Sequence, residues 1–451
     1  MIQPPLPQQE VMTNYTLEHE ECGIFAHPGT GKTKAILDAI TFLLSDLAIK
    51  GVLIVAPLRV ATLTWPNEIE LWAPHLSVAN LRTPEGLKAW DEGAAEVFTI
   101  NYDMLDKFVD RCLKKRKRIP VDMVVWDEIS KAKSHTSKRI KAFLPYRKMF
   151  SRHVGLTGTP QPNSALDLFA QIRLLDGGVR LGTSYTNFRD RYATGDFMGW
   201  SYELNEGSEE AIRDKIKDMC LVIRREDWAG AVDITYEDID IALPPAVMKD
   251  YKKMEKDFLV EIARKEVVAL TAATLVQKLL QFTSGASYFI DDTGNRDVVK
   301  IHDAKTSALL KLHESLGRKP LLVFTQFKHE VPRIMEAMPW AQEFDENRMQ
   351  EWNDGKIPLW ICHPKSMAHG LSLQGTCHHV CWFSLTYSNE DFIQGNARIA
   401  RTGQKNPVTV YRLLANKTVD WAVSETLRRK ETSQSALMET LRFVRKVAEA
   451  S

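Results

Sequence analysis

Short runs of β-branched and apolar residues alternate with helical stretches along most of this chain, and this alternation limits the possible folds more than any other feature. A strand, a crossover helix and a second strand in sequence are typical of a parallel sheet with helices on its faces. The sequence therefore predicts an α/β fold. In the first half, the predicted strands cover residues 24–26, 52–56, 97–100, 123–126 and 154–156.

The alternation pauses between about residues 181 and 300, where charged helical segments such as 208–220 and 247–266 dominate. It resumes with predicted strands at residues 321–324, 359–362, 380–383 and 408–413. A chain of 451 residues is also too long for one ordinary domain. We therefore predict two α/β lobes, residues 1–237 and 238–451, with a mainly helical insertion after about residue 180 of the first and before about residue 300 of the second.

The overall composition excludes several classes of protein. With 44% hydrophobic and 26% charged residues the chain lies close to the globular average, which excludes global disorder. No stretch approaches eighteen uncharged apolar residues, and the start lacks the features of a secretion signal, so no membrane association is expected. Six cysteines without a CxxC pair favour a reducing, cytoplasmic setting. The net charge of +1 means that a nucleic-acid partner would have to meet positive charge segregated onto one face.

The first predicted strand runs into the sequence AHPGTGKT at residues 26–33, and a helical stretch follows. A strand, a glycine loop and a helix in this order make a phosphate cradle, because the loop and helix amides face the anion. Lys32 would reach the β and γ phosphates of a nucleotide, and the Thr33 hydroxyl would hold Mg²⁺. The residues expected to contact the nucleotide are His27, Pro28, Gly29, Thr30, Gly31, Lys32 and Thr33.

Two carboxylates follow the predicted strand at residues 123–126, namely Asp127 and Glu128. Carboxylates at the tip of a buried strand are costly unless they hold a metal ion or act on a substrate. Asp127 is the expected Mg²⁺ partner, and Glu128 is expected to orient and deprotonate an attacking water. Together with the loop at Lys32, the pair predicts hydrolysis of ATP.

Further segments make the chain resemble the Swi/Snf family of helicase superfamily two. They are APLRVATLTWPNEIELWAP at residues 56–74, with Trp65 and Glu68, TINYDML at 99–105, LTGTPQPN at 156–163 and QGNARIARTGQ at 394–404. The resemblance implies two RecA-like lobes and an ATP-driven motor on double-stranded DNA. It also implies that segment 99–105 is a DNA-contacting strand. Such a motor follows the phosphate backbone, so little base preference is expected.

The spacing of Gln394, Arg398, Arg401 and Gln404 resembles the sixth helicase motif of that family. On a helix, Gln394, Arg398 and Arg401 would share one face, at steps of four and three. The resemblance implies that this face meets the phosphates held by the first lobe, where an arginine stabilises transition-state charge. The sequence does not rank Arg398 against Arg401.

The chain also departs from the family pattern. It has DEIS in place of a DEAH-like tetrad, so Ser130 stands in the histidine position, and HGLSLQ at residues 369–374 has Ser372 in place of asparagine. The glutamine motif is reduced to LPQQ at residues 6–9, with Gln9 as the suggested adenine contact. The short insertions resemble those of compact phage and prophage members, which implies the cytoplasm of a bacterial or phage-infected cell.

Two other functions stay open at this point. One is a helicase that separates DNA or RNA strands, although the sequence shows no clear apolar or aromatic pin to act as a wedge. The other is an ATP-gated clamp that binds DNA and hydrolyses slowly. The sequence does not identify protein partners, such as replication or recombination proteins.

Overall fold

The computed structural model describes residues 4–114, 118–158, 164–195, 202–224, 227, 231–264, 269–290, 296–367, 373–386 and 388–428. The chain forms two compact units, Met1–Ala231 (unit 1) and Val232–Ser451 (unit 2). The boundary predicted after residue 237 falls inside strand β10 (Ile234–Ile241). That strand pairs along its whole length with β17 (Val408–Ala415), which places all of its residues in unit 2.

Unit 1 is built on a seven-stranded sheet with the order β3-β4-β2-β5-β6-β1-β9, and every pair in it is parallel. All carboxyl ends therefore meet at one edge, which positions the functional site. The five strands predicted in the first half are confirmed as β1, β2, β4, β5 and β6. The strands are β1 (Glu21–Ala26), β2 (Val52–Ala56), β3 (Val78–Asn80), β4 (Val97–Asn101), β5 (Met123–Asp127), β6 (Arg152–Thr157) and β9 (Cys220–Ile223).

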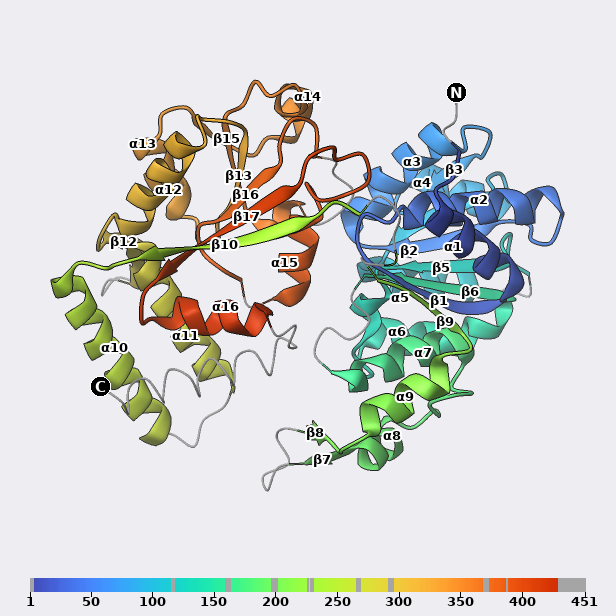
Figure 1. Cartoon of the computed structure of the whole chain (residues 1–451). Helices are drawn as coiled ribbons and strands as arrows, with labels where there is room; N and C mark the ends of the chain where they lie inside the picture. Colours follow the sequence, from blue (N-terminus) through green and yellow to red (C-terminus); the bar gives the residue numbers. More distant parts are fainter. Residues whose placement is uncertain are drawn as a thin grey trace. The chain divides into compact units, whose positions relative to one another are not determined.

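Helices cover both faces of this sheet, which explains why its strands are continuous apolar runs (Figure 1). One face packs against α1 (Pro7–Glu18), α2 (Lys32–Ser45) and α3 (Trp65–Trp72). The other face carries a core rich in aromatic side chains, which continues into the later helices. The helices that contribute to this second core are α4 (Pro84–Glu92), α5 (Leu105–Phe108), α6 (Lys138–Phe143), α7 (Leu168–Asp176), α8 (Tyr185–Tyr192) and α9 (Ser208–Ile216).

Unit 2 has a six-stranded parallel sheet with the order β10-β17-β16-β13-β15-β14. The four strands predicted in the second half are confirmed as β13 (Leu321–Phe324), β15 (Leu359–Cys362), β16 (His379–Trp382) and β17, and β14 (Ala341–Glu343) adds an edge. Two helices pack on one face, α12 (Ala304–Ser315) and α13 (Glu330–Ala337). The helices in the other core are α10 (Pro245–Arg264), α11 (Ala269–Ser284), α14 (Met349–Asn353), α15 (Asn389–Asn396) and α16 (Val419–Arg428).

The region between about residues 181 and 300 contains more than the predicted helices. It supplies β9 to the sheet of unit 1 and β10 to the sheet of unit 2, and both are edge strands. Two antiparallel hairpins also form there, β7 (Ala193–Gly195) with β8 (Tyr202–Leu204) and β11 (Ala286–Ile290) with β12 (Arg296–Lys300). An edge strand keeps polar residues, and β10 is acidic and largely exposed, so its sequence lacks the signature of a buried strand.

The fold class is therefore the predicted one, an α/β chain with two parallel-sheet units. Among the helices in the described part of the chain, none has the length and apolar character needed to span a membrane.

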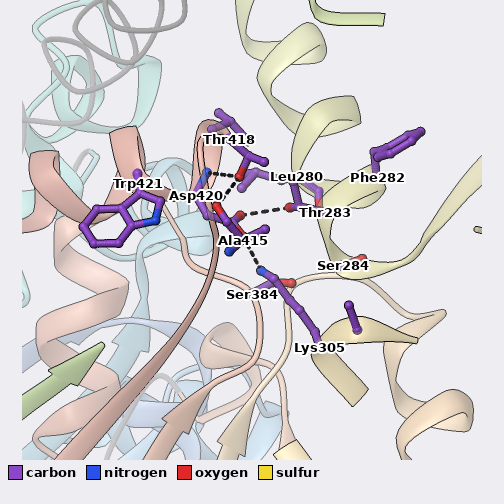
Figure 2. Close-up of polar contacts among 12 residues, drawn as sticks. Leu280, Phe282, Thr283, Ser284, Lys305, Ser384, Ala415, Thr418, Asp420 and Trp421 are labelled. Atoms are coloured by element: carbon purple, nitrogen blue, oxygen red, sulfur yellow. Dashed lines mark hydrogen bonds and ion pairs between the residues drawn. The ribbon is translucent and has the colours of Figure 1, made fainter. Parts of the chain in front are cut away.

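A buried ion pair ties three parts of unit 2 together (Figure 2). Lys305 Nζ lies 2.7 Å from Asp420 Oδ2, and both side chains are fully buried. Asp420 also accepts hydrogen bonds from the Ala415 amide, at 2.9 Å, and from Thr283 Oγ1, at 2.9 Å. The carboxylate thus links the end of α11, the first turn of α12 and the connection from β17 to α16. Such a pair is costly to break because either partner alone is a buried, uncompensated charge.

We expect Lys305→Met to lower the free energy of unfolding by about 3–5 kcal/mol, because it leaves the Asp420 carboxylate buried without its counter-charge. Adding Asp420→Asn to that variant should recover part of the loss. The exposed pair of Lys356 with Asp354 is the control, and Lys356→Met should cost less than about 1 kcal/mol. Urea denaturation followed by circular dichroism measures all three. Equal losses for Lys305→Met and Lys356→Met would contradict the role given to the buried pair.

Candidate functional site

The phosphate loop joins β1 to α2 at the carboxyl edge of the unit 1 sheet. Gly29 and Gly31 have φ angles of 89° and 83°, in the left-handed region that favours glycine. Gly31 precedes the first residue of α2, Lys32, so the amides of the helix N-terminus open onto the loop. This arrangement is suited to an anion, because the helix dipole and the amides act on it together.

The remaining loop residues hold the loop in shape. Lys32 Nζ donates to the carbonyl oxygens of Ala26, at 2.6 Å, and His27, at 3.3 Å. Thr30 Oγ1 donates to the same His27 carbonyl at 2.9 Å. A phosphate bound in the loop would offer the Lys32 ammonium charged oxygens in place of these carbonyls, which makes a stronger hydrogen bond.

Two glutamines of α1 lie beside the phosphate loop. Gln9 Oε1 accepts a hydrogen bond from the Leu6 amide at 2.8 Å, and its Nε2 lies 2.1 Å from where a side chain at Gly31 would begin. Gln9 therefore contacts the loop and stabilises the start of α1. Gln8, which the sequence analysis did not single out, is 5% exposed, and neither atom of its amide has a hydrogen-bond partner. It is a second candidate for contacting a base, and two adjacent glutamines in the motif were the signal for it.

Asp127 ends β5 and lies close to the phosphate loop, because only β6 separates β5 from β1. Its Oδ2 accepts a hydrogen bond from Trp65 Nε1 at 2.8 Å. Burial, followed by the neighbouring Glu128 carboxylate, raises the pKa of Asp127 to about 6. The Trp65 hydrogen bond and the Lys32 ammonium act in the opposite direction. The Trp65 hydrogen bond thus fixes the carboxyl group at a position where its ionised form is disfavoured.

Glu128 adopts a left-handed conformation, with φ 55° and ψ 56°. Outside glycine this conformation costs about 1–2 kcal/mol, so the surroundings must stabilise it. Its Oε1 accepts hydrogen bonds from Thr157 Oγ1 at 2.6 Å and from Ser130 Oγ at 2.8 Å. Ser130, in the position of the DEAH histidine, thus orients the carboxylate expected to act on water.

The residues predicted to hold Mg²⁺ have the right chemistry for it. Thr33 offers a hydroxyl oxygen in the first turn of α2, and Asp127 offers a carboxylate at the end of β5, at the same edge of the sheet. Oxygen ligands of this kind, completed by phosphate oxygens and water, are what Mg²⁺ prefers. Within the described ranges, no group of three or more His, Cys, Asp or Glu side chains is arranged to bind a metal ion.

The predicted arginine segment lies in unit 2, and one part of its prediction is wrong. Gln394 lies on α15, but that helix ends at Asn396, so Arg398 and Arg401 lie in the turns that follow it. They therefore do not share a helix face with Gln394. The Asn396 side chain is fixed at the helix end, because its Oδ1 accepts a hydrogen bond from Trp382 Nε1 of β16 at 3.0 Å.

The turns after α15 are themselves tied to the rest of unit 2. The Arg398 carbonyl accepts a hydrogen bond from the Leu373 amide at 3.2 Å, and Gln404 Nε2 donates to the Cys377 carbonyl at 2.7 Å. Both arginines thus lie on a loop with fixed ends. Residues 159–163 of LTGTPQPN and residues 369–372 of HGLSLQ, including Ser372, lie outside the described residues.

Comparison with known proteins gives consistent findings. A family model described as the SNF2-related domain matches residues 8–281. The protein p41 of Acyrthosiphon pisum secondary endosymbiont phage 1 is 34% identical over 97% of this chain and 98% of its own length. An uncharacterized ATP-dependent helicase of Mycoplasma genitalium is 24% identical over 93% of this chain. The match covers 40% of that helicase, so this chain corresponds to less than half of it.

Among solved structures, the Hef helicase domain of Pyrococcus furiosus is similar with a TM-score of 0.56. The match covers 95% of this chain and 98% of that chain, at 16% sequence identity. At this identity the likeness shows the fold alone, which agrees with two RecA-like lobes.

The raised pKa of Asp127 predicts a pH-dependent stability of the chain without nucleotide or metal. The folded state binds this proton more tightly than the unfolded state, so stability falls as the pH rises through about 6 and stays lower above it. Asp127→Asn should therefore stabilise the fold by about 1–2 kcal/mol at pH 7.5, and by less at pH 5. Thermal melting in EDTA at the two pH values measures this. Asp46→Asn, at an exposed position, is the control, and a stabilisation that does not depend on pH would contradict the prediction.

Proposed function

The chain belongs to the SNF2-related family, and from this premise we propose that it hydrolyses ATP to move along double-stranded DNA. The observation that best supports the proposal is the acid pair beside the phosphate loop, where Glu128 is held by Thr157 and Ser130. A carboxylate fixed in this way is suited to orienting a water molecule. Relatives that are ATP-dependent helicases support the same chemistry. The phage relative supports the cytoplasm of a bacterial or phage-infected cell as the setting.

In the proposed reaction the loop at residues 27–33 binds the phosphates of ATP, and Lys32 exchanges its carbonyl contacts for phosphate oxygens. Thr33 and Asp127 would hold Mg²⁺, which when bound neutralises charge on the β and γ oxygens. Glu128 Oε1 is held by two hydroxyl donors, so the carboxylate is oriented to accept a proton from the attacking water. Gln9 and Gln8 are the candidates for contacting the adenine.

An arginine of unit 2 is proposed to stabilise the charge of the transition state. Arg398 and Arg401 follow α15 on a loop that is fixed by a backbone hydrogen bond at Arg398 and by the side chain of Gln404, which suits them to reach a phosphate. A guanidinium meets two phosphate oxygens together, and such an arginine is worth roughly a thousand-fold or more in rate. Gln394, at the end of α15, would support this segment.

DNA binding is proposed to follow the backbone, with little dependence on base sequence. Segment 99–105, which continues past the end of β4, is the candidate contact in unit 1 that the family resemblance implies. The segment directly after β2, residues 57–65, is proposed as a second candidate, because β2 pairs in parallel with β4 and both segments leave the same edge of the sheet. The alternatives, a strand-separating helicase and an ATP-gated clamp, share the same ATP site. They differ in what hydrolysis does to the nucleic acid, so only measured movement separates them.

We expect Lys32→Ala and Glu128→Gln to abolish turnover in different ways. Lys32→Ala should weaken ATP binding, because the loop loses its only full positive charge. Glu128→Gln should bind ATP normally and lower the hydrolysis rate about a hundredfold or more, because the general base is gone. Fluorescent-nucleotide binding and phosphate release measure the two effects, with the exposed Glu18→Gln as control. Hydrolysis at the unaltered rate by Glu128→Gln would refute its role.

Movement along DNA is tested by displacement of a triplex strand from duplex DNA, with a forked duplex as the comparison. The unaltered chain should displace the triplex strand and open little of the fork. Arg401→Ala should bind ATP and DNA but lose the DNA-stimulated part of hydrolysis and the displacement, and Arg401→Lys should rescue poorly because lysine lacks the planar fork. Arg398→Ala, measured beside it, decides which arginine acts.

Efficient opening of the fork without triplex displacement would favour the helicase over the translocase. Tight DNA binding with neither displacement nor fork opening would favour the clamp.

A further inference from the structure

Trp65 links the segment after β2 to the carboxylate proposed to hold the metal ion. It is the first residue of α3 and follows a π-helical turn, Val60–Thr64. Its side chain is fully buried, and its Nε1 donates to Asp127 Oδ2 at 2.8 Å. A π-helical turn is uncommon and marks functional sites more often than chance. Here it directs the indole inward while Leu63, in the same turn, is 46% exposed.

Tyr102 makes a similar link from the segment after β4. It directly follows the last residue of that strand and is 5% exposed. Its Oη lies 3.1 Å from the carbonyl oxygen of Asp127 and 3.4 Å from that of Glu128. The phenol thus donates to the backbone at the point where Glu128 takes up its left-handed conformation.

The two aromatic residues therefore hold different parts of the same pair. Trp65 fixes a side-chain oxygen of Asp127, and Tyr102 fixes the peptide backbone that sets the direction of Glu128. Both come from segments that are candidate DNA contacts. Because both rings are buried in close-packed surroundings, a shift of either segment must move its donor atom relative to the acid pair.

We propose that Trp65 and Tyr102 are positioning residues that transmit duplex binding at the segments after β2 and β4 to the acid pair. This inference rests on the proposed function, since it requires DNA to bind at those segments. Trp65 sets the geometry of the metal-binding carboxylate, and Tyr102 sets the orientation of the carboxylate that acts on water. Both residues are proposed to act through the acid pair, not on the substrate directly.

A purely structural role for the rings makes a different prediction. Trp65 belongs to the core between the sheet and α1 to α3, so replacing it by a smaller residue also creates a cavity. A cavity lowers stability but has no reason to act on metal affinity or on the ratio of DNA-stimulated to basal hydrolysis. The variants must therefore remove the hydrogen-bond donor while keeping the ring.

Two replacements meet this condition, and a third, Trp65→Phe, removes the donor but also makes the ring smaller. Tyr102→Phe removes only the hydroxyl. Replacement of Trp65 by 3-benzothienyl-alanine keeps the size of the ring but lacks the N–H. This variant is measured beside Trp65→Phe and takes its place if Trp65→Phe folds poorly. The matched control is Trp72→Phe on the same helix, whose Nε1 donates to Glu68 Oε2 at 2.7 Å. Trp72 has the same kind of hydrogen bond, but its acceptor is not part of the acid pair.

Three measurements are made on the full chain. They are Mn²⁺ binding in the presence of ADP, followed by electron paramagnetic resonance, the kcat and KM for ATP with and without duplex DNA, and the melting temperature. Both Trp65 variants should raise the half-saturating Mn²⁺ concentration about tenfold, the effect of losing a hydrogen bond to a charged group. Tyr102→Phe should keep Mn²⁺ affinity and KM but lower kcat, mainly in the presence of duplex. Trp72→Phe should match the unaltered chain.

This inference would be overturned if the benzothienyl and Tyr102→Phe variants both kept the Mn²⁺ affinity and the duplex stimulation of the unaltered chain. That outcome counts only if duplex DNA stimulates hydrolysis by the unaltered chain. The same losses in Trp72→Phe would also overturn it, because they would show a general effect of the helix. Lack of duplex stimulation in the unaltered chain would instead overturn the proposed function. The Mn²⁺ measurement would then still decide whether Trp65 positions the metal-binding carboxylate.

Discussion

Asp127 and Glu128 are adjacent carboxylates at the end of a buried strand. Several segments of unit 1 supply hydrogen bonds that offset the electrostatic cost of keeping them there. Burial and the neighbouring Glu128 carboxylate oppose ionisation of Asp127, which is why its pKa rises to about 6. Donors from the strand ends on either side offset this cost. They come from the segments after β2 and β4, from the last residue of β6 and from the turn after the pair itself. The parallel sheet makes this possible, because it brings all these strand ends to one edge.

The sequence predicted the strands of both sheet interiors, because a strand buried on both faces must be apolar along its whole length. It did not predict β9 and β10, which both lie at sheet edges. β10 is acidic and largely exposed, whereas β9 is a run of only four residues, CLVI, that directly follows a charged helical segment. The phosphate loop and the acid pair were also predictable. Their chemistry requires particular residues at fixed spacing beside a strand, and both the residue types and the strand can be found in the chain without knowledge of the fold.

The contacts between distant segments could not be predicted in the same way. The hydrogen bond from Trp65 to Asp127 joins residues 62 positions apart, and no local pattern reports it. The end of α15 is a similar case. A helical spacing through Arg401 is consistent with the sequence, but α15 ends at Asn396, whose side chain is bonded to Trp382, and the Arg398 carbonyl after it accepts from the Leu373 amide. Tertiary contacts of this kind override local helix preference, and the same holds for the ion pair of unit 2, which joins α12 to the start of α16.

Ser130 shows how a departure from a family pattern can be accommodated by the backbone. The left-handed turn at Glu128 brings the Ser130 hydroxyl to the carboxylate two residues before it, at 2.8 Å, where Thr157 of β6 also donates. A histidine at position 130 would add a group that titrates near neutral pH, whereas two hydroxyls do not titrate in that range. The orientation of Glu128 in this chain is therefore independent of the protonation of its donors. Glu128 is linked to the phosphate loop through β6. Its hydrogen-bond donor Thr157 is followed by Gly158, which packs against Pro28 of the loop with no room for a side chain.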